Sequence, residues 1–230
     1  VFAGSFGAGV IVEWLRRLRL AGTELMLAGV VLVSPVTCIA DLIVPGAAKP
    51  STLIGRALKP FLDSTSSPTE ATVEKSRAVF LRMFEAGAQN RLALRSLMSP
   101  QEIQRLRSAV MATIRGLTVD GARQRVLALS RMISPTEYFS PNLLPLTEAP
   151  TLVLFAERED AVLDARAPVL FALERAPRAY FPQCTVQRVF ARPGQAAVQH
   201  ASLIFHVFKF LPPLQAFYQH VRRTSLACAA

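Results

Sequence analysis

A single serine among small residues at the start of the chain constrains the fold more than any other feature. Residues 1–9 read VFAGSFGAG, with Ser5 at their centre, and residues 10–20 then show the spacing of an amphipathic helix. Where a strand turns sharply into a helix the backbone is crowded, so the residues two before and two after the serine must be small. Ala3 and Gly7 occupy these positions, giving A-x-S-x-G where G-x-S-x-G is usual. The pattern predicts a serine hydroxyl held clear of a sheet on a strand-to-helix turn.

A phosphate-binding loop fits the same stretch less well. The pattern G-x-x-x-x-G-K-[ST] is absent, no lysine lies nearby, and the G-x-G-x-x-G spacing of dinucleotide-binding turns is not met. Ordinary turns rich in Gly and Ala also contain serines, so the stretch alone leaves a purely structural turn open. The order of the later segments favours the functional interpretation.

The next segment supplies the second strand of a βαβ unit. Residues 27–33, LAGVVLV, form a continuous apolar run, which is typical of a strand buried on both faces in a parallel sheet. With the helix at 10–20 between two strands, the arrangement is that of a βαβ unit. At this point the sequence resembles the α/β-hydrolase family, whose nucleophile elbow is similar to residues 4–8, GSFGA.

A long helical insertion follows. No buried strand is predicted from about residue 49 to residue 146, whereas S-P-x-E occurs three times, each a capping box with Pro at the first helical position. In the family such an insertion forms a cap that shapes the substrate pocket. We therefore predict an α/β fold: a partial α/β-hydrolase sheet of mainly parallel strands flanked by helices, with an inserted helical cap. The expected parts are core residues 1–48, cap residues 49–147 and core residues 148–230.

An acidic cluster follows the next buried strand. Residues 149–156, APTLVLFA, predict this strand, and E-R-E-D follows directly. Ligands of open α/β sheets gather beyond the carboxyl ends of strands, so an acidic group there is placed for function. The segment resembles the family's strand that ends in the acid of the catalytic triad, although Ala156 replaces a glycine of that turn. We favour Asp160 because the apolar triplet A-V-L follows it, with Glu159 as the alternative; a solvated acidic turn is the competing interpretation.

A histidine follows the last predicted strand. That strand is predicted at residues 185–191, TVQRVFA, and His200 lies between it and a closing helix. The family places its triad histidine in such a loop, so the resemblance assigns the role to His200, although Gln199 stands where glycine is commoner. His206 and His220 fall in apolar or basic helical stretches, and we interpret both as structural.

Serine, acid and histidine, in that chain order and each after a strand, follow the α/β-hydrolase pattern. The resemblance implies Ser5 as nucleophile, His200 as general acid and base, Asp160 as orienting acid and the Phe6 N–H as an oxyanion donor. It predicts a serine hydrolase, similar to esterases, lipases and thioesterases, that cleaves small-molecule acyl esters or thioesters through an acyl-enzyme. No metal and no cofactor are expected. Serine at the elbow argues against dehalogenase and epoxide-hydrolase chemistry, which use a carboxylate nucleophile.

Two alternatives concern activity. The chain does not begin with Met and opens on the end of an apparent strand, so we expect it to be truncated at its N-terminus. The early strands and the second oxyanion donor would then be absent, and the isolated chain is expected to be poorly active and poorly soluble. Because Ala3, Ala156 and Gln199 are off pattern, a non-catalytic α/β-hydrolase-like binding protein, or an inactive fragment of the enzyme, is the alternative.

The charge is strongly positive but dispersed. The net charge is +10, carried mostly by arginines spread along helical segments, with no basic stripe interleaved by aromatic residues. We therefore expect no nucleic-acid partner, and peripheral association with a membrane stays open. The apolar run at residues 25–40 contains Pro35 and falls short of the roughly 20 residues that span a bilayer.

The numbers and spacing of cysteines and histidines bear on metal binding and on the redox compartment. The three cysteines, Cys38, Cys184 and Cys228, form no C-x-x-C pair, and three histidines give no metal-ligand cluster. An odd number of unpaired cysteines favours a reducing compartment, so a cytoplasmic location is favoured.

Overall fold

A computed structural model describes residues 1–23, 25–44, 49–62, 69–88, 99–131, 145–194, 197–200, 203 and 207–227. Its strands are β1 (Phe2–Gly4), β2 (Val30–Val33), β3 (Thr151–Ala156) and β4 (Cys184–Val189). Its helices are α1 (Phe6–Leu20), α2 (Ile39–Leu42), α3 (Leu53–Leu62), α4 (Glu70–Ala88), α6 (Pro100–Arg115), α7 (Val119–Arg131), α9 (Pro168–Leu170), the π-helical η2 (Phe171–Arg175), α10 (Pro177–Tyr180) and α11 (Val207–Ala227).

The described strands form one parallel sheet in the order β1-β2-β3-β4. Each strand pairs with the next in sequence, so all carboxyl ends meet at one edge. The connections between parallel strands must cross over a face of the sheet, and helices supply them. The predicted sheet of parallel strands is thereby confirmed for the described residues.

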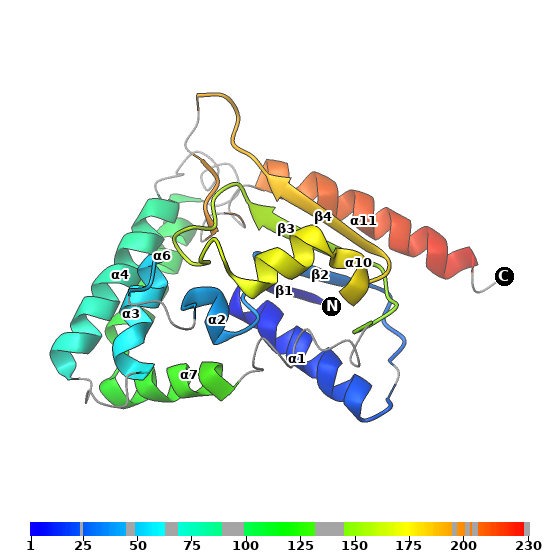
Figure 1. Ribbon diagram of the computed structural model, residues 1–230. Helices are drawn as coiled ribbons and strands as arrows, with labels where there is room; N and C mark the ends of the chain where they lie inside the picture. The colour runs from blue at the N-terminus through cyan, green and yellow to red at the C-terminus, as the bar shows by residue number, and fades with distance from the viewer. Residues whose placement is uncertain are drawn as a thin grey trace.

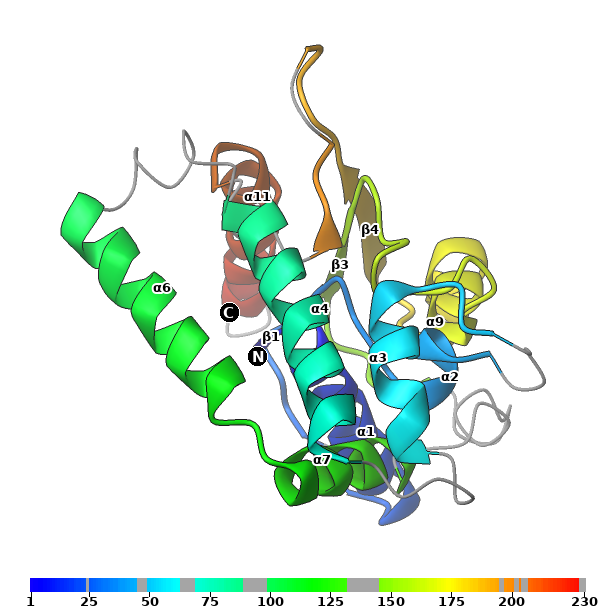
Figure 2. The ribbon, with the colours of Figure 1, turned by 90° about the vertical axis from the view of Figure 1, so that its left-hand side faces the viewer.

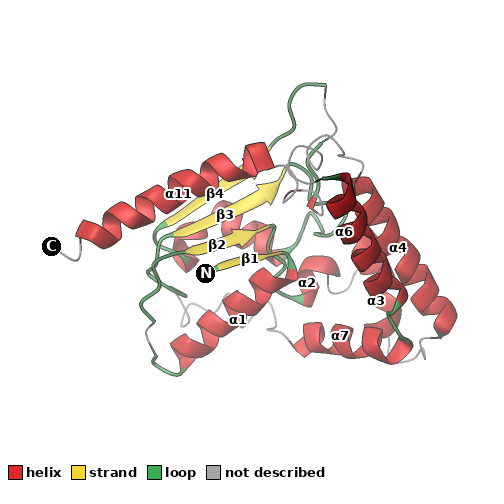
Figure 3. Cartoon of the chain, turned by 180° about the vertical axis from the view of Figure 1, so that it is seen from behind, coloured by secondary structure: helices red, strands yellow, loops and turns green. Residues whose placement is uncertain are grey.

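Helices cover both faces of the sheet, and the alternation of side chains along the strands shows which helix covers which face. Val30 and Leu32 belong to one apolar cluster together with residues of α1, α9, η2 and α10. Val31 and Val33 point the other way and pack with Phe210 of α11. Figure 3 shows the sheet between α1 and α11. A sheet buried on both faces explains why β2 and β3 read as continuous apolar runs.

The helices between β2 and β3 gather beyond the carboxyl edge of the sheet. In Figure 1 and Figure 2, α3, α4, α6 and α7 lie together on the side toward which β3 and β4 point. Ser99 begins α6 as predicted: its hydroxyl accepts the Glu102 N–H, and the Glu102 carboxylate accepts the Ser99 N–H at 2.7 Å. The serines of the other two S-P-x-E motifs, Ser67 and Ser134, lie outside the described residues. The division of the chain at residues 48 and 147 stays a prediction.

Several elements begin or end elsewhere than predicted. The first helix begins at Phe6 rather than residue 10, directly after Ser5. The strand predicted at 27–33 is confined to Val30–Val33, since Gly29 lies against α11, where an added Cβ would come within 3.1 Å of Phe217 and of Val221. The closing helix expected after His200 extends over Val207–Ala227. Among the described helices, none is long and apolar enough to span a bilayer.

Asp164 links the segment after β3 to the start of α3. Its buried carboxylate accepts the backbone N–H and the guanidinium of Arg166, and Ser51 donates its hydroxyl to it. Arg166 above all, together with Ser51, lowers the pKa of this carboxyl to about 2. A pKa below the unfolded value means that the stabilisation is present above about pH 4 and is lost as the pH falls toward 2.

We expect Asp164→Asn to remove this acid-sensitive stabilisation. At pH 5 the variant should have a free energy of unfolding lower by roughly 1–2 kcal/mol, allowing for solvent screening around the exposed Arg166. Because the wild-type contribution disappears in acid, the difference should shrink as the pH falls toward 2. Urea unfolding of both proteins across this pH range measures it, and a difference independent of pH would contradict the assignment.

Candidate active site

Ser5 sits on a strained turn between β1 and α1. Its backbone has φ 49° and ψ −125°, a conformation that L-residues rarely adopt. Two hydrogen bonds hold it there, one to the last residue of β2 and one to the loop that follows: the Ser5 N–H donates to Val33 O at 2.8 Å, and the Val36 N–H donates to Ser5 O at 3.1 Å. Strain persists at such a position only when the surroundings fix it. The expected strand-to-helix turn around Ser5 is present, with the side chain half-buried.

The explanation given above for the small residues at the turn is not supported by their surroundings. A Cβ added at Gly7, two residues after Ser5, would meet no described atom within 4 Å apart from its chain neighbours and the backbone of its own helix. Among the described residues the turn is therefore not crowded at Gly7, whereas the backbone of Ser5 itself is strained.

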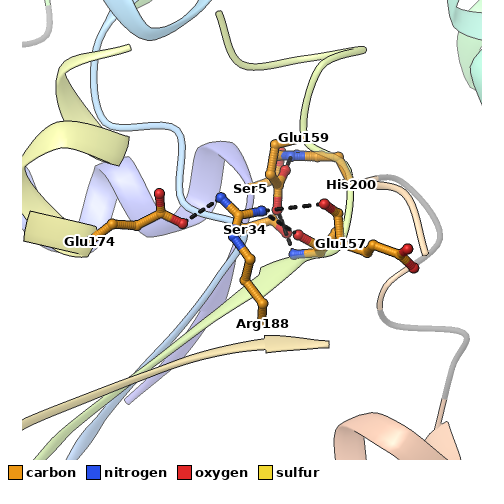
Figure 4. A network of polar contacts seen from close by, with 8 residues as sticks. Ser5, Ser34, Glu157, Glu159, Glu174, Arg188 and His200 are labelled. Atoms are coloured by element: carbon orange, nitrogen blue, oxygen red, sulfur yellow. Dashed lines mark hydrogen bonds and ion pairs between the residues drawn. The ribbon is translucent and has the colours of Figure 1, made fainter. Parts of the chain in front are cut away.

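Ser5, His200 and Glu159 form one hydrogen-bonded chain at the carboxyl edge of the sheet (Figure 4). The Ser5 Oγ lies 2.8 Å from His200 Nε2, and His200 Nδ1 lies 2.5 Å from Glu159 Oε2. His200 and Glu159 are only 8% and 4% exposed. An ionised carboxylate can only accept, so the ring proton resides on Nδ1 and leaves the Nε2 lone pair to accept the Ser5 hydroxyl.

The preference for Asp160 over Glu159 requires correction. Asp160 is exposed and pairs with Arg158 at 2.7 Å, outside the hydrogen-bonded chain. A parallel bridge between Arg158 and Gln199 aligns the acidic turn with the segment that carries His200. The residue after Arg158 therefore faces inward beside the imidazole, whereas the following residue faces solvent.

Ser34, which follows β2, holds the other oxygen of the Glu159 carboxylate. Glu159 Oε1 accepts the Ser34 hydroxyl at 2.7 Å and the Ala156 N–H at 2.6 Å. Ser34 is buried and has φ 43°, and in the described chain it and Ser5 are the non-glycine residues with positive φ. The sequence analysis missed Ser34. A serine directly after the buried strand beside the elbow was the available signal.

We expect loss of the Ser34 hydroxyl to reduce turnover without weakening the fold in proportion. Ser34→Ala and Ser34→Gly both remove one of two donors that orient Glu159, and each should lower kcat by about 10-fold to 100-fold. Glycine also accepts positive φ, so Ser34→Gly should be the more stable of the two variants. Kinetics with a neutral ester and thermal unfolding test both statements. Activity that follows stability across the pair would show a merely structural role.

Glu157 holds the loop that delivers His200. Its Oε2 accepts the N–H of Ala191 at 2.8 Å and the N–H of Val198 at 3.3 Å. These two bonds attach both residues to the segment that directly follows β3. The Ala191 N–H is the main reason why the pKa of Glu157 is below its ordinary value. Backbone bonds from Arg158 N–H to Val198 O and from His200 N–H to Arg158 O complete the attachment. The sequence analysis did not identify this role.

Arg188 braces the acidic turn from β4. Its guanidinium donates to Ala156 O at 2.8 Å and to Glu157 O at 3.4 Å, and it forms an ion pair with Glu174 (Figure 4). It also lies over the Phe155 ring. The carbonyl groups at the end of β3, just before Glu159, are thereby held by a side chain of β4.

An apolar cavity of about 760 Å³ opens beside Ser5 and His200 and reaches under the helices between β2 and β3. Its described wall comes from the sheet edge, from α3 and α4, and from α7 with the turn before it. Most of these side chains are aliphatic or aromatic: Val33, Val36, Leu42, Ile54, Leu58, Phe61, Phe80, Leu117, Ala122, Val126, Ala128 and Val162. Phe6 lies at the same mouth, and its N–H is the first amide of α1, where the helix dipole favours negative charge.

Other reactive groups of the described chain lie apart from this chemistry. Burial raises the pKa of the Cys38 and Cys184 thiols to about 12, so neither is a thiolate at neutral pH. Within the described ranges, no group of three His, Cys, Asp or Glu side chains could hold a metal ion.

Comparison of whole folds finds solved structures that are similar to this chain. No protein-family model matches the sequence, and comparison with curated proteins gives no match. A variant of an epoxide hydrolase from Bacillus megaterium is similar in structure, with a TM-score of 0.54 and 12% identity over 95% of this chain and 68% of that one.

Two further structures are similar at lower scores. A candidate aryl esterase from Burkholderia cenocepacia gives a TM-score of 0.48 with 18% identity over 100% of this chain, and a candidate lipase from Acinetobacter baumannii gives 0.43 with 14% identity over 95%. The chain spans 64% and 61% of the lengths of these two proteins. The match to the epoxide hydrolase variant, together with the parallel sheet order and the elbow at Ser5, establishes that this chain has an α/β-hydrolase fold.

Proposed function

We propose that the protein is a serine hydrolase that cleaves ester or thioester bonds of small acyl compounds through an acyl-enzyme. The observation that carries this proposal is the unbroken hydrogen-bonded chain from the Ser5 hydroxyl through His200 to the buried Glu159 carboxylate. Each member offers the atom that its step requires: a hydroxyl oxygen that can attack, a ring nitrogen that can accept its proton, and a carboxylate that holds the other ring nitrogen.

In the first half of the reaction, Ser5 Oγ attacks the substrate carbonyl carbon while its proton passes to His200 Nε2. Glu159 keeps the Nδ1 proton in place and stabilises the imidazolium without becoming protonated. The Phe6 N–H, the first amide of α1, then donates to the carbonyl oxygen as it becomes negative. The bond to the alcohol or thiol then breaks, and His200 returns its proton to that leaving group.

In the second half, water replaces the leaving group. His200 Nε2 takes a proton from the water as it attacks the acyl carbon, and the tetrahedral intermediate collapses to expel Ser5 Oγ. His200 gives the proton back to Ser5, and the carboxylic acid leaves. Atoms and charge balance, and the free enzyme is restored.

The substrate class follows from the cavity and the nucleophile. A largely aliphatic cavity of about 760 Å³ favours an acyl chain of substantial apolar size over a polar one. Epoxide opening by a covalent route uses a carboxylate nucleophile, whereas Ser5 offers a hydroxyl. Ester or thioester hydrolysis is therefore the better match, although one structural neighbour is an epoxide hydrolase.

Labelling with a fluorophosphonate tests the function directly. Such a probe phosphonylates a serine only when a base activates it, so we expect stoichiometric labelling of the Ser5 peptide, together with hydrolysis of 4-nitrophenyl octanoate. Labelling should be absent from Ser5→Ala. A folded protein that neither reacts with the probe nor turns over the ester would support the non-catalytic alternative and defeat the proposal.

A further inference from the structure

Arg125 is unlike the other side chains of the cavity wall. Among the described residues that line the cavity, it alone carries a permanent charge, and it belongs to α7, whereas Ser5 lies at the sheet edge. The remaining polar lining groups already have partners: Ser76, for example, donates to Ala57 O at 2.9 Å, and Ser34 donates to Glu159. A cation facing an otherwise apolar cavity needs an explanation.

No described carboxylate neutralises Arg125. The acidic residues of α4 that form ion pairs, Glu70 and Glu74, are engaged by Arg77, and Glu102 is engaged by its own capping box at Ser99. Among the side chains that the structure describes, none forms an ion pair or hydrogen bond with Arg125, which is exposed and lines the cavity. Its five donors are therefore available to a ligand.

The surroundings of Arg125 reinforce this charge. Residues 99–131 contain two acidic residues, Glu102 and Asp120, against six arginines. Those arginines are Arg105, Arg107, Arg115, Arg123, Arg125 and Arg131. The charges of this part of the cap add to a positive potential, which raises the local concentration of anions and speeds their association.

We propose that the substrate is anionic, with an apolar acyl chain in the cavity that ends in a carboxylate paired with Arg125. This rests on the proposed function. The guanidinium matches a carboxylate in a two-point, charge-assisted hydrogen bond. The anion belongs to the acyl part because that part stays attached to Ser5 in the acyl-enzyme, so the contact with Arg125 persists through both halves of the reaction, whereas the leaving group departs after the first.

The experiment compares matched neutral and anionic esters that are soluble as monomers. The substrates are 4-nitrophenyl esters of monocarboxylic acids and 4-nitrophenyl half-esters of dicarboxylic acids with six to twelve carbons, assayed at pH 7. We expect the anionic ester of the best-fitting length to have a kcat/KM about tenfold above that of its neutral counterpart, the amount of a partly exposed ion pair. The preference should peak at one chain length, because a carboxylate that is too near or too far cannot meet Arg125.

Arg125→Gln should abolish this preference by lowering kcat/KM for the anionic ester to the value of its neutral counterpart in the same variant. Arg123→Gln is the matched control, since Arg123 is exposed on the same helix but does not line the cavity. It removes the same charge and should preserve the preference. If both variants lost the preference for the anionic ester equally, its cause would be the overall positive potential rather than an ion pair with Arg125. A wild-type protein with no such preference at any chain length would also overturn the inference.

The controls separate this inference from the proposed function. Hydrolysis of neutral esters and fluorophosphonate labelling are measured on the same preparations. If both succeed while anionic and neutral esters are hydrolysed alike, only the role of Arg125 is wrong. If neither occurs in the folded wild-type protein, the proposed function itself fails.

Discussion

Replacing Ser5 by alanine should lower kcat for ester hydrolysis by a factor on the order of 10⁵ to 10⁶, the cost of removing a serine nucleophile from an intact triad. The geometry gives the reason: the Ser5 Oγ lies 2.8 Å from His200 Nε2, and this hydroxyl is the one the imidazole contacts. KM should change little, because the apolar cavity that binds the acyl chain is untouched. Steady-state kinetics with 4-nitrophenyl octanoate measure both constants.

The strained backbone at Ser5 provides the control for this variant. Glycine tolerates the φ of 49° that alanine resists, so Ser5→Gly should be as inactive as Ser5→Ala but more stable to heat. Two inactive variants with different stabilities would show that the loss comes from the missing hydroxyl. A Ser5→Gly protein that kept more than a tenth of the activity would mean that another group is the nucleophile.

Replacing Glu159 by glutamine should lower kcat by about 10⁴-fold, as expected when the orienting carboxylate of a triad becomes an amide. Two donors, the Ser34 hydroxyl and the Ala156 N–H, contact one carboxylate oxygen, so the amide oxygen must take that place. The amide nitrogen then faces His200 Nδ1 and donates to it. The ring proton then resides on Nε2, and a protonated Nε2 cannot accept the proton of the Ser5 hydroxyl.

The neighbouring acid is a control built into the chain. Asp160→Asn removes an exposed carboxylate that pairs with Arg158, and it should leave kcat within about twofold, since exposed ion pairs contribute little. The two variants therefore separate adjacent positions by several orders of magnitude. If Asp160→Asn were the damaging change and Glu159→Gln were tolerated, the observed hydrogen-bonded chain would not be the working one.

The sequence predicted the fold well, because the fold depends on local patterns. Continuous apolar runs marked β2 and β3, the small residues marked the turn at Ser5, and Ser99 marked the start of α6. Burial of a strand on both faces and capping of a helix each depend on a few consecutive residues, so the sequence pattern predicts them.

The candidate site was less predictable, because it depends on contacts between distant segments. Whether Glu159 or Asp160 faces His200 is decided by the bridge between Arg158 and Gln199, which links residues 41 positions apart and leaves no local pattern. Ser34 and Glu157 escaped notice for the same reason, since their partners lie far along the chain. Sequence spacing favoured the wrong acid by one position, and one position changes the direction in which a side chain points.

The helices between β2 and β3 contribute to the cavity but not to the hydrogen-bonded chain of the candidate site. Ser5, Ser34, Glu159 and His200 all come from the sheet edge, whereas α3, α4 and α7 contribute cavity wall and none of the hydrogen-bonded chain. On the proposed function, replacing residues 34–150 except Ser34 by the corresponding segment of another protein with this fold would change which compounds are accepted and leave the hydrogen-bonded chain in place. Substitutions in α3, α4 and α7 can therefore alter the cavity wall without changing any residue of the hydrogen-bonded chain.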